Sequence, residues 1–428
     1  MSRLSGRYCI VGIGETEYSR WSGRTTLSMA CEAILKAARD AGLAVDEIDG
    51  ITSHQTSAGD SCTNDQVATA LGIRTDVGVD ILGGGNSIGQ LVHQSVGLLE
   101  GGHCEVIAIF RSMNGRSGVR MGGGAPTARG SEPGAARPQL ASGMNQFEIP
   151  WGIRGAPTRF AMEAMAYLHR YGYSTLNMAE LAVTQRQAAT NNLKATRREA
   201  ISIDDHQNSR WITKPFRLLD CCQENDVAAS LIITSAERAR DLAQPPVYIL
   251  GGNARASSYN PYWVGALADI NEGWSTHVGE RSFANAGIDR GDIDIVTMYD
   301  NFTTTPMKYL EAFGFCGEGE GGAFIGDGRI GLDGELPQNT NGGQLSEGYA
   351  HGAGYLIEMT RQLRGQADDY CPGWAEGEHH YDRAGGCRQV RSREDRRSGN
   401  RDNPSPPTIS FSVGGGGTAQ GWSVALRR

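Results

Sequence analysis

Along the chain, an apolar run typical of a strand is followed by apolar positions with helical spacing, and this succession occurs twice. An apolar run opens each copy, RYCIVGIGETEYS (7–19) and PPVYILGGNARAS (245–257), and each run predicts a strand. An alanine-rich segment with helical spacing follows, ACEAILKAARDAG in the first copy and ERSFANAG in the second. Each helix leads into a further strand pattern, GITSH (50–54) or IVTMYDNF (295–302). This alternation predicts an α/β protein with mostly parallel sheets covered by helices.

A sequence repeat marks the same two copies. The segment AGLAVDEIDGI (41–51) returns as AGIDRGDIDIV (286–296), with the glycine, the acidic pair and the Ile-Asp ending in register. A repeat of this kind indicates two structural units of similar fold. We therefore expect two α/β halves, 1–240 and 241–428.

Two polar stretches interrupt these halves. The first begins with NGRSGVRMGGGAPTARGSEPGAARPQLASG (114–143) and predicts a long loop insertion, about residues 114–225, with helical text at 159–192. We expect this insertion to lie over the first half, because long ordered loops are often lids or binding loops. The second stretch, 368–407, interrupts the second half and is expected to be exposed, and its arginines at 391–401 favour a solvated surface.

Composition narrows the class of protein. The 428 residues are 39% hydrophobic and 21% charged, which is typical of a soluble globular protein. No apolar run approaches the ~20 residues of a membrane span, and no signal peptide is evident, so we expect a cytoplasmic protein that binds no membrane. Nine scattered cysteines without CxxC spacing indicate reduced thiols, and a net charge of -8 disfavours nucleic acid as a partner.

Three glycine-rich loops carry the candidate chemistry. ILGGGNSIGQ (81–90) lies between a strand pattern and a helix pattern, SFSVGGGGTA (410–419) forms a hairpin, and NTNGGQLSEGYAHGAG (339–354) precedes a helix. Over nearly the whole chain, these loops resemble the thiolase superfamily, specifically its sterol carrier protein-x type branch. The resemblance implies a five-layered α/β/α/β/α fold built from two similar halves.

The chain departs from that family at its catalytic positions. Asn86 stands where the thiolase motif NNNCSTGS has its nucleophilic cysteine, and Ser412 stands at the second cysteine, in CxGGG. Tyr349 takes the place of the GHPxG histidine, and Tyr299, in YDNF, takes the place of the HDCF histidine. A carboxamide forms no acyl-thioester, so the covalent step of a thiolase is excluded at this position.

Cleavage that needs no acyl acceptor remains possible. In a retro-aldol reaction, a β-hydroxyacyl-CoA loses its hydroxyl proton, the Cα–Cβ bond breaks, and the thioester enolate takes up a proton. The chain resembles the steroid side-chain aldolases, which release a ketosteroid and a short acyl-CoA such as propionyl-CoA and have tyrosines in both motifs. The resemblance implies that Tyr299 and Tyr349 are the catalytic acid and base, in an order that the sequence leaves open.

The motifs around the two tyrosines contain further candidate site residues. His351 is a candidate for positioning or proton relay, although a structural histidine is an equal alternative, and Asp300 in YDNF is a second candidate. The superfamily match implies that the backbone amides of Asn86 and Gly414 form an oxyanion hole.

We expect no metal and no cofactor in this chain. His379 and His380 lie between Cys371 and Cys387, but irregular spacing and the absence of CxxC argue against zinc. The resemblance implies a homodimer formed through the first half. It also implies a small OB-fold and zinc-ribbon partner protein, which would hold any zinc.

Two other functions compete with the aldolase. A thiolase-like carrier would bind an acyl-CoA or a sterol without chemistry, but it would have no need of phenols at both former histidine positions. An acyl-CoA thiolase or acetyltransferase would need a displaced nucleophile, such as Cys62 or Cys104.

Overall fold

The computed structural model of the chain describes residues 2–56, 60–118, 149–153, 155–257, 273–370, 388–400, 405–416 and 420–428. Within them, nine strands form one sheet in the order β3-β2-β4-β7-β1-β8-β11-β10-β9. Their bounds are β1 Tyr8–Glu15, β2 Gly50–Gln55, β3 Val77–Leu82, β4 Val106–Asn114, β7 Asp226–Ser235, β8 Val247–Ser257, β9 Ile295–Met298, β10 Ile409–Gly416 and β11 Gln420–Arg427. A separate hairpin pairs β5 (Trp211–Thr213) with β6 (Phe216–Arg217).

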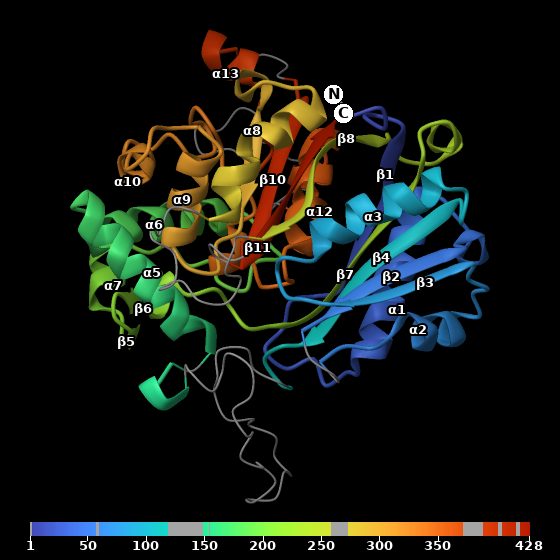
Figure 1. The fold of residues 1–428 in the computed structure, drawn as a ribbon, viewed down its shortest axis with the longest axis horizontal. Helices are drawn as coiled ribbons and strands as arrows, with labels where there is room; N and C mark the ends of the chain where they lie inside the picture. The colour runs from blue at the N-terminus through green and yellow to red at the C-terminus, as the bar shows by residue number, and fades with distance from the viewer. Residues whose placement is uncertain are drawn as a thin grey trace, which may run out of the picture.

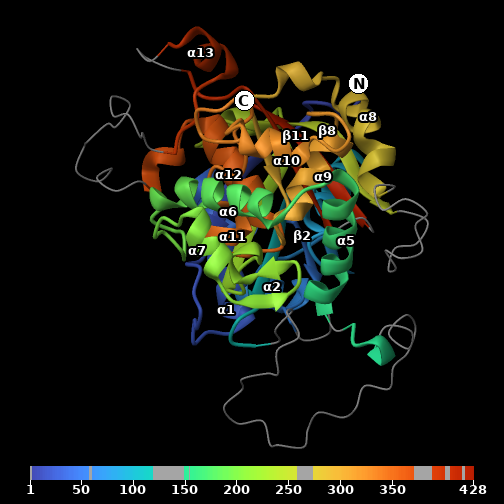
Figure 2. The same cartoon turned by 90° about the vertical axis from the view of Figure 1, so that its left-hand side faces the viewer.

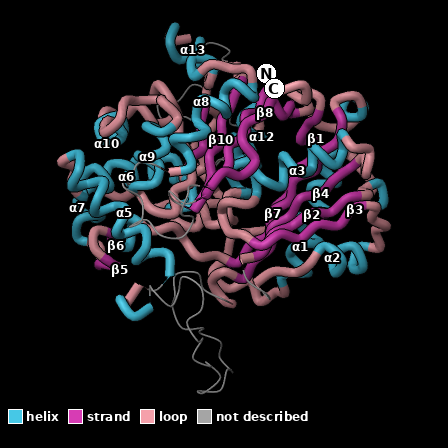
Figure 3. Tube along the Cα trace, viewed as in Figure 1, coloured by secondary structure: helices cyan, strands magenta, loops and turns pink. Residues whose placement is uncertain are grey.

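The strand order repeats on either side of the sheet's centre. Outward from the pairing of β1 with β8, the order is β7, β4, β2 on one side and β11, β10, β9 on the other. Gln338 makes a parallel bridge to Val296 on β9, at the place that β3 occupies beside β2. Figure 3 shows the strands as two groups that meet near β1 and β8. The expectation of two similar halves is confirmed, while the boundary at residue 240 stays a prediction.

Strand polarity differs from the expectation. Among the strands named above, β2 pairs in parallel with β3 and β4, and β9 pairs in parallel with β10. The pairs β1·β7, β4·β7, β1·β8, β8·β11 and β10·β11 are antiparallel. The prediction of mostly parallel sheets was therefore wrong. Strand β7 runs against both of its neighbours, β1 and β4, and β11 runs against both β8 and β10. In the chain, β7 follows the long insertion and β11 follows β10 directly.

Helices separate and cover the two strand groups. Helix α1 (Thr26–Ala41) contacts β1, β4 and β7, whereas α8 (Trp274–Ala286) contacts β8 and β11. Between them, α3 (Ile88–Glu100) and α12 (Ala353–Arg364) each contact strands of both halves. Figure 1 shows α3 and α12 between the strand groups, with α1 and α2 (Asn64–Leu71) outside one group and α8 and α9 (Thr304–Ala312) outside the other. The five-layered order is confirmed.

The described helices of the insertion lie on the opposite half from the one expected. Its helices are α5 (Gly155–Tyr171), α6 (Thr175–Thr190) and α7 (Ile203–Asn208), which agrees with the helical text at 159–192. Helix α6 contacts α10 (Gly321–Gly326) and α11 (Gly343–Ser346), both in the second half. Figure 2 shows α5, α6 and α7 beside α9, α10 and α11. The apolar faces of α5 and α6 join the second half's core, which fixes their place.

The described parts of the polar stretch 368–407 are less exposed than expected. Arg388 is fully buried and forms an ion pair with Glu358 of α12, and Val390 is also buried. Arg393 and Arg396, in the short helix α13 (Arg393–Ser398), bond to the 290–294 turn. Arg391, Arg393 and Arg396 are half-buried and Arg397 is exposed, so the prediction of a solvated arginine surface holds only in part. Cys371, His379, His380 and Cys387 lie outside the described residues.

No helix in the described part of the chain is both long enough and apolar enough to cross a membrane.

Candidate active site

The two tyrosines of the replaced thiolase motifs meet in the structure. Tyr299 follows β9, is 2% exposed, and donates its backbone N–H to the Val413 carbonyl of β10 at 3.0 Å. Tyr349 lies between α11 and α12, and its backbone N–H donates to the Asn225 side chain at 3.1 Å. The two hydroxyl oxygens are 2.8 Å apart, so one phenol donates a hydrogen bond to the other. We call Tyr299 and Tyr349 the tyrosine pair.

Burial keeps both phenols protonated. It raises the pKa of Tyr299 well above its ordinary value, and the neighbouring Tyr349 raises it further. Burial also raises the pKa of Tyr349, as does the Cys222 thiol, while the bond from Tyr299 and the charge of Arg111 oppose the increase. At neutral pH the pair is therefore two neutral hydroxyls that share a hydrogen bond.

The glycine elbow between β3 and α3 lies against the pair. A Cβ on Gly85 would collide with the Tyr299 hydroxyl, so only glycine fits there. The Gly85 carbonyl accepts a 2.8 Å hydrogen bond from Nε1 of Trp422 on β11. The Trp422 ring also lies against Gly414, where a Cβ would collide with it. Trp422, which the sequence analysis missed, joins the two glycine loops beneath the tyrosine pair.

Asn86 and Gly414 therefore lie on loops that share Trp422 as a support. Asn86 follows Gly85 immediately, and its side-chain oxygen accepts a 3.2 Å hydrogen bond from Ser87. Ser412, at the position of the second thiolase cysteine, is fully buried and receives a 2.8 Å hydrogen bond from Thr297. The oxyanion role of the Asn86 and Gly414 amides stays a prediction.

Asp300 holds the loop that carries Tyr349. Its buried carboxylate accepts from the backbone N–H groups of Gln344 at 2.9 Å and Leu345 at 3.2 Å, and from the Tyr355 hydroxyl. Burial raises the pKa of Asp300 to about 6. Gly343 has φ +62, and a Cβ there would collide with the carboxylate. Through these contacts, Asp300 positions the loop that carries Tyr349.

His351 belongs to a buried polar cluster next to the pair. Its ring lies 4.8 Å from that of Tyr349 and 5.5 Å from that of His54, measured between centroids. Arg111 donates from Nε to His351 Nδ1 at 2.9 Å and from Nη2 to Asp60 at 3.0 Å. The sequence analysis missed Arg111, Asp60 and His54, because each is a single polar residue without a motif in the first half.

Comparisons with known proteins agree with this geometry. Residues 263–373 match the family model of the thiolase C-terminal domain-like proteins. A steroid side-chain-cleaving aldolase of Thermomonospora curvata is 39% identical over 376 residues, 85% of this chain and 92% of the relative. The chain belongs to the thiolase superfamily, in the branch of these aldolases. As a member of that branch, it is a carbon–carbon lyase of CoA thioesters.

Other relatives place the enzyme in the same branch and fold. The 17-hydroxy-3-oxo-4-pregnene-20-carboxyl-CoA lyase of Mycobacterium tuberculosis is 39% identical over 374 residues, with the same coverage of 85% and 92%. The solved structure of an Ltp2-ChsH2(DUF35) aldolase has a TM-score of 0.82 and 33% identity, and covers both chains completely. Human mitochondrial 3-ketoacyl-CoA thiolase, with a TM-score of 0.65 and 14% identity over 100% of this chain and 99% of its own, shares the fold.

The cysteines of the thiolase alternative pack in other cores than Tyr299 of the aldolase's tyrosine pair. Cys62 belongs to the core around α1 and α2, and Cys104 lies near Gly50, where β2 begins. Tyr299 belongs to the core of the second half. Burial raises the pKa of each of these two thiols to about 12, so neither is a ready nucleophile.

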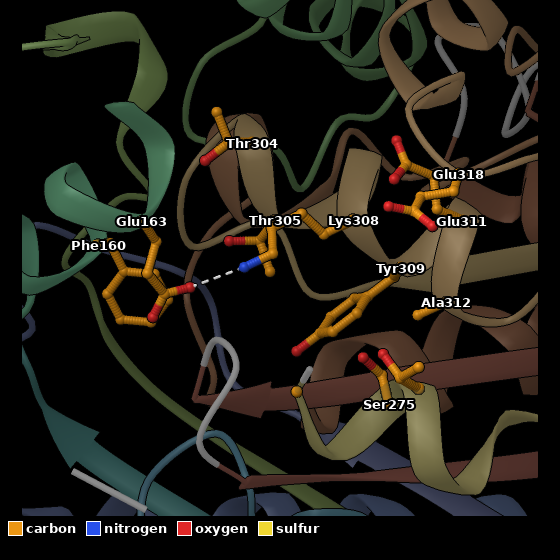
Figure 4. Close-up of a pocket in the computed structure, with 12 residues that line it drawn as sticks. Phe160, Glu163, Ser275, Thr304, Thr305, Lys308, Tyr309, Glu311, Ala312 and Glu318 are labelled. Carbon is orange, nitrogen blue, oxygen red and sulfur yellow. Dashed lines mark hydrogen bonds and ion pairs between the residues drawn. The ribbon is translucent and has the colours of Figure 1, made fainter. Parts of the chain in front are cut away.

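A cavity of about 210 Å³ opens in the aldolase beyond Phe302, three residues after Tyr299. Phe160 of α5 lines it and lies 4.9 Å from the Phe302 ring, between centroids. Figure 4 shows Glu163 of α5 facing Lys308 of α9 across one side, where their ion pair spans 3.1 Å. Neither tyrosine of the pair lines this cavity.

Proposed function

We propose that the chain is an aldol lyase that cleaves a β-hydroxyacyl-CoA bearing a tertiary hydroxyl on a steroid side chain. The products are a ketosteroid and a short acyl-CoA such as propionyl-CoA. The observation that carries this proposal is the hydrogen-bonded pair Tyr299 and Tyr349, with Asn86 where a thiolase has its nucleophile. The activities for which the two relatives at 39% identity are named support the reaction class and the steroid substrate.

The pair can move one proton without a net change of charge. The substrate hydroxyl gives its proton to one phenol oxygen, and that phenol passes its own proton across the 2.8 Å bond. The second phenol then protonates Cα. The O–H electron pair becomes the ketone π bond, and the Cα–Cβ pair passes through the thioester enolate into the new C–H bond. The raised pKa of each phenol suits this neutral relay, which needs no cofactor or metal.

We further propose a cytoplasmic homodimer that works with a small OB-fold and zinc-ribbon partner. Support for the dimer comes from β3, which is an edge strand with Leu82 68% exposed. Support for the partner comes from the similar Ltp2-ChsH2(DUF35) aldolase, whose name joins two components. A compact monomer in solution scattering would contradict the dimer. Full turnover by the isolated chain would contradict the need for a partner.

The function is tested with a series of β-hydroxyacyl-CoAs that carry tertiary alcohols. Each is incubated with the enzyme without free CoA, and products are identified by mass spectrometry. We expect a ketone and a short acyl-CoA in equal amounts, because a retro-aldol product already carries its thioester. Binding without products would indicate a carrier of acyl-CoA or sterol, and cleavage that consumes CoA would indicate a thiolase.

A further inference from the structure

A groove of about 950 Å³ lies beside β1 and α1, and neither tyrosine of the pair lines it. Three separate segments form most of its wall: residues 13–20 at the end of β1, the last turns of α1, and residues 193–198 after α6. Helix α12 contributes Arg361. Segments that are far apart in the chain therefore present their side chains to one groove.

Two carboxylates of the groove already have partners inside the protein. Glu15 pairs with Arg361 at 2.5 Å and also with Lys194. Asp40 pairs with an arginine of α12 at 2.8 Å. Among the described residues that line the groove, Glu17 is the one further acidic side chain. The groove therefore has little negative charge of its own to offer.

Three arginines supply positive charge to the same groove. Arg20 follows β1, Arg39 lies in the last turn of α1, Arg198 follows α6, and all three are exposed. In the part of the chain that the structure describes, no carboxylate forms an ion pair with any of them. Burial lowers the pKa of Arg197, and the nearby charge of Arg20 lowers it further, so like charges are crowded here. The groove is thus positive, although the whole chain carries a net charge of -8.

Apolar side chains lie next to these arginines. Leu193 lines the groove and is 49% exposed. Trp21 follows Arg20 directly in the chain and is 65% exposed. Exposed side chains of this size lose contact with water when a ligand covers them, which favours binding. The groove therefore suits a ligand that is both anionic and partly apolar.

The groove also adjoins the loop that carries Tyr349. Tyr18 lines the groove and is only 4% exposed. A Cβ on Gly348 would collide with the Tyr18 ring, so the two residues are closely packed. Because Gly348 directly precedes Tyr349, only the Tyr18 side chain separates this loop from the groove. A wall that is packed in this way is preformed, which lowers the entropic cost of binding.

We propose that the groove docks an acidic peptide segment of a partner protein, with apolar residues among its carboxylates. Arg20, Arg39 and Arg198 bind the carboxylates, because one guanidinium can donate two parallel hydrogen bonds to a carboxylate. Leu193 and Trp21 cover the apolar residues of the segment. Tryptophan and arginine are the residue types that most often dominate the energy of protein interfaces. This interaction goes beyond the proposed reaction and does not depend on it.

Other anions fit these observations less well. A nucleic acid would be repelled by the net charge of -8 and by Glu17 at the groove itself. A free phosphate would fill only a small part of about 950 Å³ and would leave Leu193 and Trp21 exposed. An acidic peptide with apolar residues matches the charge, the size and the apolar side chains together.

The test uses the full chain and a short fluorescent peptide of alternating glutamate and leucine. We expect fluorescence anisotropy to give a Kd below about 100 μM in about 0.15 M salt. Arg20→Ala and Arg198→Ala should each weaken binding at least about fivefold. The matched control is Arg74→Ala, which removes an exposed arginine between α2 and β3 and should change the Kd less than about twofold. Circular dichroism confirms that each variant is folded.

A second peptide and two competitors test the kind of ligand. A peptide with serine in place of leucine should bind at least about fivefold more weakly. Equal affinity for both peptides, no binding by the wild-type chain, or equal losses in Arg74→Ala and the groove variants would overturn the proposal. Displacement of the peptide by an equal concentration of pyrophosphate or CoA would also overturn it, in favour of a small-anion site. None of these measurements requires aldol cleavage, so their outcome is separate from that of the proposed function.

Discussion

The hydroxyl oxygen of Tyr299 lies 2.8 Å from that of Tyr349, although 50 residues separate them in the chain. One phenol follows β9, and the other lies just before the buried helix α12. Their contact places two phenols side by side where a thiolase-type site is organised around cysteine. The fold of the superfamily has thus been kept, while the chemistry that we propose at its centre is a proton relay in place of acyl transfer.

The glycine elbow should be intolerant of side chains at one position and tolerant at its neighbour. Gly85→Ala would drive a methyl group into the Tyr299 hydroxyl, so we expect kcat to fall by roughly 10²-fold or more. Gly84→Ala meets only the Thr56 methyl at 3.4 Å and His351 Nε2 at 4.0 Å, and serves as the matched control. Steady-state kinetics of both variants, with circular dichroism to confirm folding, test this. Equal activities would show that the Gly85 contact is unimportant.

Thiol modification should spare the reaction. Burial raises the pKa of Cys221 to about 12 and that of Cys222 well above its ordinary value, so few thiolates exist at neutral pH. Iodoacetamide should therefore leave turnover largely intact.

Alkylation of Cys222 needs its own control. Because the Cys222 thiol influences both tyrosines, its alkylation would block the site by bulk alone. Cys222→Ala is the control, and we expect it to be active. Loss of turnover on alkylation of Cys222→Ala would support a cysteine nucleophile.

The rate should depend little on pH near and above neutrality. A relay of two neutral phenols needs no phenolate, and burial raises both phenol pKa values. We expect kcat to vary less than about threefold from pH 7 to pH 9. A mechanism that requires a phenolate would instead give about a tenfold increase per pH unit. The pH profile of single-turnover cleavage distinguishes the two.

Asp300 should make stability depend on pH in a defined sense. Its pKa is about 6 in the folded chain and 3.8 as the ordinary value, so the folded state holds this proton more tightly. The group therefore favours folding below its unfolded pKa, and that contribution is lost as pH rises through about 6. Asp300→Asn cannot ionise. Relative to wild type, its free energy of unfolding should improve by roughly 1 kcal/mol from about pH 5 to about pH 8. An unchanged or opposite difference would contradict the assignment.

Local patterns were sufficient for the individual elements. Segment 7–19 contains β1, segment 245–257 contains β8, and segment 81–90 contains the elbow between β3 and α3. Strand polarity and the side on which the insertion packs could not be predicted in this way. Both depend on which distant segments pair, and one helix face is compatible with either half.

The site was predictable only where a motif extends over several neighbouring residues. YDNF and GYAHG carry Tyr299, Asp300, Tyr349 and His351, and the structure brings all four together. Arg111 and Trp422 were missed because each is a single residue on a strand. Their importance arises from burial and from partners that lie 240 and 337 residues away in the sequence.

The most direct test of the tyrosine relay is single-turnover cleavage by Tyr299→Phe, Tyr349→Phe and the double variant, without free CoA. Each single change should lower the rate of ketone and acyl-CoA formation by roughly 10²–10⁴ while CoA-ester binding stays nearly unchanged. Because the phenols act as one relay, the double variant should be little slower than the singles. The matched control is Tyr8→Phe, at the first residue of β1. It removes only a hydroxyl that bonds to Glu100. A double variant that cleaves at the wild-type rate would contradict the central claim.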